Sequence, residues 1–118
     1  MRWIALHRPE SRNGLTVELN LRIIQALAGC SADPSVRAVV ITGEGGAFSS
    51  GLDFRAAMLR DSSDRGADLD AAFHGLIRAV RALDKPVIAL VDGPAVGFGC
   101  DLALACDLRL GTPRTRFG

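Results

Sequence analysis

The chain has 118 residues, 48% of them hydrophobic, and its 14 basic and 13 acidic side chains leave a net charge of +1 at pH 7. A chain of this size is expected to form one domain, residues 1–118, with its own core. The balanced charge gives no electrostatic case for nucleic acid or an anionic membrane surface as a partner. No apolar run approaches the length of a membrane span or a secretory signal, so we expect a cytoplasmic protein.

The first half of the chain alternates apolar runs with turn residues. WIALHR (3–8) is a short apolar run that ends at a proline, and it predicts a strand. Thr16 precedes a stretch with apolar residues at helical spacing, which predicts a helix that Gly29 can end. RAVVITG (37–43) is apolar on both faces, as a strand inside a covered parallel sheet requires.

The second half continues the alternation. Residues 55–68 are polar without a period and are expected to be the least ordered part. Apolar residues between positions 69 and 80 then predict an amphipathic helix, with His74 largely off the apolar stripe. VIALVDG (87–93) repeats the buried-strand pattern, a short apolar helix follows, and DLRLG (107–111) predicts one more strand. This order indicates an α/β fold with a parallel sheet.

Cysteine and histidine patterns point to no separate site. Cys30, Cys100 and Cys106 form an odd set without a CxxC pair, which favours reduced thiols and no metal site. His7 and His74 could act as bases, but no motif pairs either of them with a serine. We expect His74 to be a solvated helix residue.

Two glycine-rich loops follow buried strands, in VVITGEGGAFSSGLDF (39–54) and VIALVDGPAVGFGCDLALACD (87–107). In a parallel sheet both loops lie at the carboxyl ends of strands, where ligands usually bind. Because glycine has no side chain, a ligand can approach the main chain closely. The two loops therefore suggest two N–H donors that converge on one oxygen atom of a ligand. The second donor would be near Phe98, with Asp101 facing the same space. The alternative is that the glycines only make tight turns and close contacts, and spacing alone does not choose.

Other site motifs are absent or incomplete. Gly43-x-Gly45-x-x-Phe48 is only part of a dinucleotide fingerprint, no GxxxxGK[ST] loop is present, and Ser49 and Ser50 lack the GxSxG elbow of hydrolases.

Four segments, in order, resemble the enoyl-CoA hydratase/isomerase, or crotonase, family. HRPESRNGL (7–15) is similar to N-R-P-x-x-x-N-A-L, and residues 33–54 are similar to D-x-x-V-R-x-V-V-L-T-G…F-x-A-G-x-D-L. DKPVIALVDGPAVGFG (84–99) and CDLALACDLRL (100–110) resemble K-P-V-I-A-x-x-x-G-x-A-x-G-G-G and the helix after it. The resemblance implies a partial crotonase-type (ClpP/crotonase-like) α/β fold of repeated β-β-α units, which stops before the C-terminal helices. Residues 1–118 would be a partial acyl-CoA-binding domain, and the first strand of the fold would be clipped.

The resemblance also implies roles for single residues. The backbone N–H groups of Ser50 and Phe98 would hold the thioester oxygen of an acyl-CoA. The segment Ser50, Gly51, Leu52 and Asp53 would line the site for coenzyme A and the thioester. Arg8 and Arg12 would help to hold the nucleotide end. The family needs no cofactor besides the coenzyme A carried by the substrate, and its full-length members form homotrimers or hexamers.

Asp101 is a departure from the family pattern, because it stands where hydratases carry the first of two catalytic glutamates. Its side chain is shorter by one methylene, about 1–1.5 Å of reach. Dienoyl-CoA isomerases of the family resemble this chain in having aspartate, and a second acid would lie beyond Gly118. The sequence therefore leaves three possibilities. The first, which the motifs favour most, is a hydratase, and the second is an isomerase that uses Asp101. The third is a non-catalytic remnant that binds acyl-CoA or, in the extreme case, has no stable fold.

Overall fold

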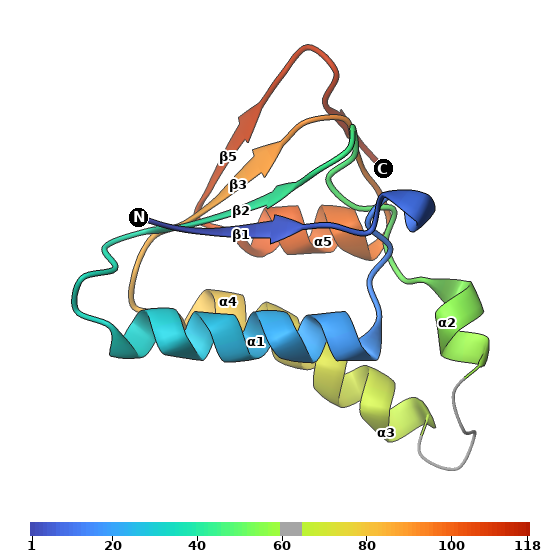
Figure 1. The fold of residues 1–118 in the computed structure, drawn as a ribbon, viewed down its shortest axis with the longest axis horizontal. Coiled ribbons are helices and arrows are strands. Elements are labelled where there is room, and N and C mark those ends of the chain that lie inside the picture. Colours follow the sequence, from blue (N-terminus) through green and yellow to red (C-terminus); the bar gives the residue numbers. More distant parts are fainter. Residues whose placement is uncertain (60–64) are drawn as a thin grey trace.

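The computed structural model describes residues 1–59 and 65–118, and its centre is a parallel sheet (Figure 1). The strands are β1 (Arg2–Leu6), β2 (Val39–Gly43), β3 (Val87–Val91) and β5 (Leu108–Gly111). They are hydrogen-bonded in the order β1-β2-β3-β5, every neighbouring pair parallel. The predicted α/β fold with a parallel sheet is confirmed, and the strands differ from the predicted ranges only at their ends.

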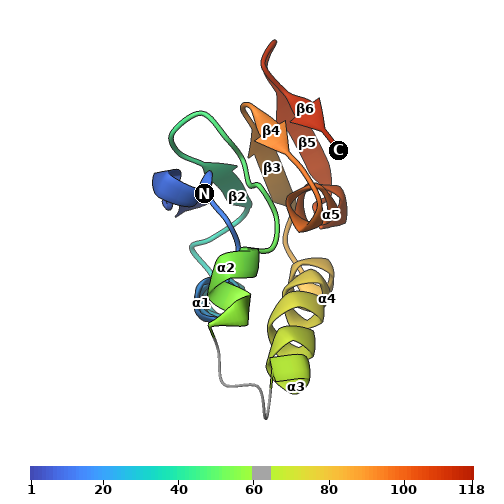
Figure 2. The ribbon, with the colours of Figure 1, turned by 90° about the vertical axis from the view of Figure 1, so that its right-hand side faces the viewer.

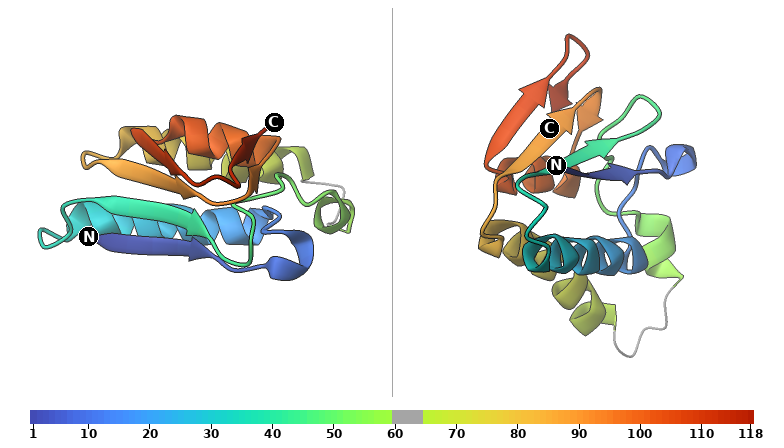
Figure 3. Two further views of the ribbon diagram at one scale, coloured as in Figure 1. Left: turned by 90° about the horizontal axis from the view of Figure 1, so that it is seen from above. Right: turned by 60° about the vertical axis from the view of Figure 1, so that its left-hand side comes forward.

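Three helices cover one face of this sheet. They are α1 (Val17–Ala32), α4 (Gly75–Ala82) and α5 (Phe98–Ala105). Seen from above, α1 runs under β1 and β2, and α5 lies on the side of β3 and β5 (Figure 3). Alternate strand residues such as Ile41 and Ala89 are fully buried against Leu27, Leu76 and Leu102 of these helices. None of the described helices is long and apolar enough to cross a membrane.

Two very short strands form a second sheet that the sequence pattern did not predict. Strand β4 (Pro94–Ala95) pairs in parallel with β6 (Arg116–Phe117). Two residues are too few to show a period, so only the tertiary pairing defines these strands. Because β4 follows β3 directly and α5 comes next, this part of the chain is one of the expected β-β-α units.

Helix α1 begins where predicted but does not end at Gly29. The Thr16 hydroxyl accepts a hydrogen bond from the N–H of Leu19 at 3.0 Å and so caps the helix. The helix continues to Ala32 because Lys85 holds its end from the far side of the core. The Lys85 ammonium donates to the carbonyl oxygens of Cys30 and Asp33, at 2.6 and 2.7 Å.

The stretch expected to be least ordered is partly helical. Asp53 caps α2 (Phe54–Met58), its carboxylate accepting from the N–H of Ala56 at 3.0 Å. Helix α3 (Arg65–Leu69) passes through a π-helical turn, Asp70–His74, into α4. Within the predicted range 55–68, residues 55–58 and 65–68 are helical, whereas residues 60–64 lie outside the described part. Figure 2 shows α3 below α4 and α5 above α4.

The three cysteines are free thiols: Cys30 and Cys106 are buried, and Cys100 is half-buried. Burial, with a smaller contribution from the nearby Asp107 carboxylate, raises the pKa of the Cys106 thiol to about 12. Its thiolate, the reactive form, is therefore scarce at neutral pH.

Lys85→Met should destabilise the protein, because it leaves the two carbonyl groups at the end of α1 without their charged donor. We expect the free energy of unfolding, measured by urea denaturation, to fall by about 1–3 kcal/mol. Arg37→Met is the control, since Arg37 is exposed and its side chain has no partner among the described residues. Equal stability of the two variants would contradict a role for Lys85 in ending α1.

Candidate functional site

The two glycine-rich loops meet at the carboxyl ends of β2 and β3. Gly51 has a φ of +91°, a conformation that other residues rarely adopt. A Cβ atom on Gly51 would lie 2.9 Å from the carbonyl oxygen of Val96 and 3.1 Å from the nitrogen of Phe98. The main chains of the two loops are therefore in contact, with no room for a side chain between them. The segment after β2 reaches this contact as it passes the N-terminal end of α5 (Figure 1).

Ser49 joins the two loops and is fully buried. Its N–H donates to the carbonyl oxygen of Pro94 at 3.2 Å, and its carbonyl oxygen accepts from Val96 at 3.1 Å. Its hydroxyl donates to the Asn13 carbonyl oxygen at 2.8 Å and accepts from the N–H of Gly51 at 3.1 Å. One side chain and its peptide groups thus fix three separate segments.

Asn13 completes this polar cluster from the turn after β1. It has a φ of +60° and is 1% exposed. Its amide donates to the carbonyl oxygens of Glu44 and Ala47, both at 2.9 Å, and its side-chain oxygen accepts from the N–H of Arg8 at 2.7 Å. The first glycine-rich loop is therefore held at both ends, by Asn13 at one end and Ser49 at the other.

The N–H of Ser50, predicted to be an oxyanion donor, is already in use. It donates to the carbonyl oxygen of Arg12 at 3.0 Å, and the Ser50 hydroxyl donates to Ser11. By contrast, the N–H groups of Leu52 and Phe98 have no acceptor among residues 1–59 and 65–118. In the described part of the chain, Leu52 and Phe98 therefore have an available N–H, whereas Ser50 does not. The sequence could not show this, because the choice depends on the hydrogen-bond register of the loop.

Two adjoining hollows open beside these N–H groups. The first, about 460 Å³, is lined mainly by apolar side chains: Leu52, Leu69, Phe73 and Phe98. The second, about 420 Å³, contains Asp101 and Arg81 together with Phe98 and Leu104. The rings of Phe73 and Phe98 meet edge to face, with centroids 4.9 Å apart. Phe98 therefore stands between an apolar compartment and one that carries a carboxylate.

His74 lines both hollows, together with Phe98. The sequence predicted a solvated position for His74, off the apolar stripe. The side chain is indeed 65% exposed, but it lies at the π-helical turn, where the helical register shifts. Its Nδ1 atom is 2.6 Å from a carboxylate oxygen of Asp70. The sequence named His74 as a possible base, but no sequence signal located the π-helical turn that places it beside Phe98.

Arg8 and Asp53, both predicted to contact coenzyme A, bind each other. The Arg8 guanidinium donates to the Asp53 carboxylate at 3.1 Å and to the Gly14 carbonyl oxygen at 2.6 Å. The N–H of Ala56, assisted by Arg8, holds the pKa of the Asp53 carboxyl below its usual range despite burial. Arg12 differs, because its side chain is exposed and has no partner in the described part of the chain.

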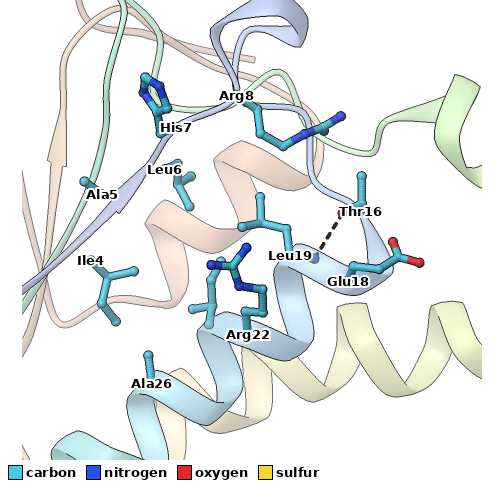
Figure 4. A pocket seen from close by; sticks show the side chains of 11 residues that line it. Ile4, Ala5, Leu6, His7, Arg8, Thr16, Glu18, Leu19, Arg22 and Ala26 are labelled. Carbon is cyan, nitrogen blue, oxygen red and sulfur yellow. Dashed lines mark hydrogen bonds between the residues drawn. The ribbon is translucent and has the colours of Figure 1, made fainter.

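A larger hollow lies elsewhere, between β1 and α1 (Figure 4). It has a volume of about 590 Å³, and Ile4, Leu6, Leu19 and Ala26 are among its lining residues. His7 lies on its rim, with Nδ1 2.8 Å from a Glu44 carboxylate oxygen. Neither Leu52 nor Phe98 reaches this hollow, so it is separate from the site between the loops.

The chain matches the family model described as enoyl-CoA hydratase/isomerase over residues 2–118. It is 36% identical to a crotonyl-CoA hydratase of Syntrophomonas wolfei over 114 residues, which cover 96% of this chain and 44% of that protein. A 4-chlorobenzoyl coenzyme A dehalogenase of Arthrobacter is 35% identical, with coverages of 97% and 42%.

A solved enoyl-CoA hydratase from Polaromonas has a TM-score of 0.90 and 37% identity, over 98% of this chain and 46% of that one. The chain thus spans less than half the length of these relatives. Such neighbours support the expected partial crotonase fold.

Ser49→Ala should be more destabilising than Ser50→Ala. The first change leaves the Asn13 carbonyl and the Gly51 N–H unpaired inside the protein, which costs about 2–3 kcal/mol. The second removes an exposed hydrogen bond and should cost less than about 1 kcal/mol. Chemical denaturation of both variants measures the difference. Similar values would mean that Ser49 does not fix the loops.

Proposed function

Because the chain belongs to the enoyl-CoA hydratase/isomerase family, we propose that it forms part of an enzyme that binds an acyl-CoA thioester and stabilises its enolate. Hydration of an enoyl-CoA is the reaction that the relatives favour most, since a crotonyl-CoA hydratase is among them. In this proposal coenzyme A arrives as part of the substrate, and no other cofactor takes part. Assembly as a homotrimer or hexamer and a cytoplasmic location stay predictions.

The observation that carries the proposal is the pair of unpaired N–H groups on Leu52 and Phe98. An unpaired N–H is uncommon inside a protein, because it costs free energy unless a ligand binds it. In this proposal the thioester oxygen accepts hydrogen bonds from both groups, and they stabilise the charge that develops on it. A single donor of this kind contributes about 2.7–4 kcal/mol to a transition state.

The acyl chain would enter the apolar hollow beside Phe73, and Asp101 would act from the second hollow. As a general acid or base, the Asp101 carboxylate would move a proton to or from water or carbon. The aspartate at this position favours a second candidate, double-bond migration in an isomerase, because dienoyl-CoA isomerases of the family resemble this chain in having aspartate there. A non-catalytic acyl-CoA-binding protein is the third candidate.

Coenzyme A would pass over the loop Ser50–Asp53. Gly51 and Leu52 would contact it there through their main chains. The Asp53 carboxylate is not available, because it already accepts hydrogen bonds from Arg8 and from an N–H of α2. Of the two arginines predicted to hold phosphate, Arg12 is the better candidate because its guanidinium has no described partner. We therefore assign the nucleotide end to Arg12 and a structural role to Arg8.

Phe98→Pro tests the oxyanion donor, with Phe98→Ala as the matched control. Both variants lose the ring, but only proline also removes the N–H, and proline is tolerated at the first position of a helix. In the protein as the cell makes it, hydration of crotonyl-CoA should be about 10²–10³-fold slower in Phe98→Pro than in Phe98→Ala. Equal rates in two folded variants would refute the role of this N–H.

Asp101→Asn should abolish most turnover while acyl-CoA affinity changes little, since the change removes a proton-transfer group and keeps the shape. Steady-state kinetics with an enoyl-CoA and calorimetric titration with a saturated acyl-CoA measure the two properties. Unchanged turnover would remove Asp101 from the mechanism. Tight binding without turnover in the wild-type protein would favour the non-catalytic candidate.

A further inference from the structure

His74 is placed where a second proton-transfer group would act on a bound thioester. It lines the apolar hollow and the hollow that contains Asp101, and both hollows share Phe98. The preceding residue, Phe73, is 7% exposed and packs edge to face on Phe98. This contact ties the π-helical turn to the start of α5, where the unpaired N–H of Phe98 lies.

Asp70 gives the His74 ring a defined proton arrangement. The 2.6 Å contact joins the carboxylate to Nδ1, so the proton of the neutral ring is favoured on that nitrogen. The lone pair of Nε2 is then available to accept a proton. Among residues 1–59 and 65–118, the other ionisable side chains that line the two hollows are Asp101 and Arg81.

We propose that His74 is a general base for carbon-bound protons and that Asp70 is its positioning residue, an inference that rests on the proposed function. Nε2 takes a proton from the carbon next to the thioester carbonyl. The C–H bond breaks, its electron pair forms the enolate, and the negative charge lies on the oxygen held by Leu52 and Phe98. The proton stays on the imidazolium, whose charge Asp70 balances. Its return to carbon restores the base.

This step has a direct readout, because the imidazolium exchanges its proton with solvent. In heavy water a saturated acyl-CoA, such as butanoyl-CoA, should gain deuterium next to its carbonyl group. Mass spectrometry detects this exchange without water addition to a double bond. The reaction therefore isolates proton removal from the rest of turnover.

His7 offers a matched control within the chain. It also has a carboxylate partner at Nδ1, at 2.8 Å, and its side chain is 70% exposed compared with 65% for His74. His7 lines the separate hollow between β1 and α1. The two histidines thus differ in location more than in local chemistry.

The experiment compares His74→Gln, Asp70→Asn and His7→Gln with the wild-type protein at its natural length. His74→Gln should slow exchange by about 10²-fold or more with little change in the affinity for butanoyl-CoA. Asp70→Asn should slow exchange less and keep affinity, and Asp70→Glu should restore part of the rate. His7→Gln should exchange at the wild-type rate.

Several outcomes would overturn the inference and are distinct from a failure of the proposed function. Wild-type exchange in His74→Gln, or equal losses of exchange and affinity, would show that His74 is not a base. Loss of exchange in Asp101→Asn alone would assign the base to Asp101, and the proposed enolate would stand. A wild-type protein that hydrates crotonyl-CoA and binds butanoyl-CoA without exchange overturns the role of His74 only. Absence of binding would remove both proposals.

Discussion

The hydrogen bonds of Ser49 are the constraint on which the candidate site depends. Its peptide groups bind Pro94 and Val96, and its hydroxyl binds Asn13 and Gly51, so segments far apart in sequence share one buried residue. A Cβ on Gly99 would lie 2.5 Å from the Ser49 carbonyl oxygen, which shows how closely α5 packs on this point. The separation of the two loops is thus set by main-chain contacts, and two glycines make the contacts possible.

The same polar cluster explains why two N–H groups stand out. Around them the loop backbone is satisfied: Ser50 donates to Arg12, Gly51 donates to Ser49, and Asp53 donates to Leu15. Leu52 lies between satisfied neighbours and has no acceptor of its own. A segment whose donors from Phe48 to Gly51 and at Asp53 are paired can be rigid, and rigid donors need little reorganisation as charge develops on a substrate.

Much of the fold could be predicted from the sequence, because buried parallel strands have a continuous apolar pattern that residues 37–43 and 87–93 display. The end of α1 could not be predicted, because it depends on a hydrogen bond from Lys85 to Cys30. These residues are 55 positions apart and meet only in the folded protein. For the site, Phe98 and Asp101 were named from the motif, and they line one hollow. Ser50 was named as a donor, but its N–H is bound by Arg12, and residue identity does not reveal hydrogen-bond register. His74 was considered as a base, but its place beside Phe98 depends on a π-helical turn that leaves no periodic trace.

In the proposed oxyanion site, the use of main-chain groups at Leu52 and Phe98 separates two properties that mutation usually changes together. Any amino acid except proline supplies an N–H, so a codon change at either position alters the wall of the apolar hollow and leaves the donor in place. Side-chain variation can then retune which acyl groups fit, one substitution at a time, without a loss of charge stabilisation. A fold of this kind can come to accept different acyl groups while the same pair of N–H donors is kept.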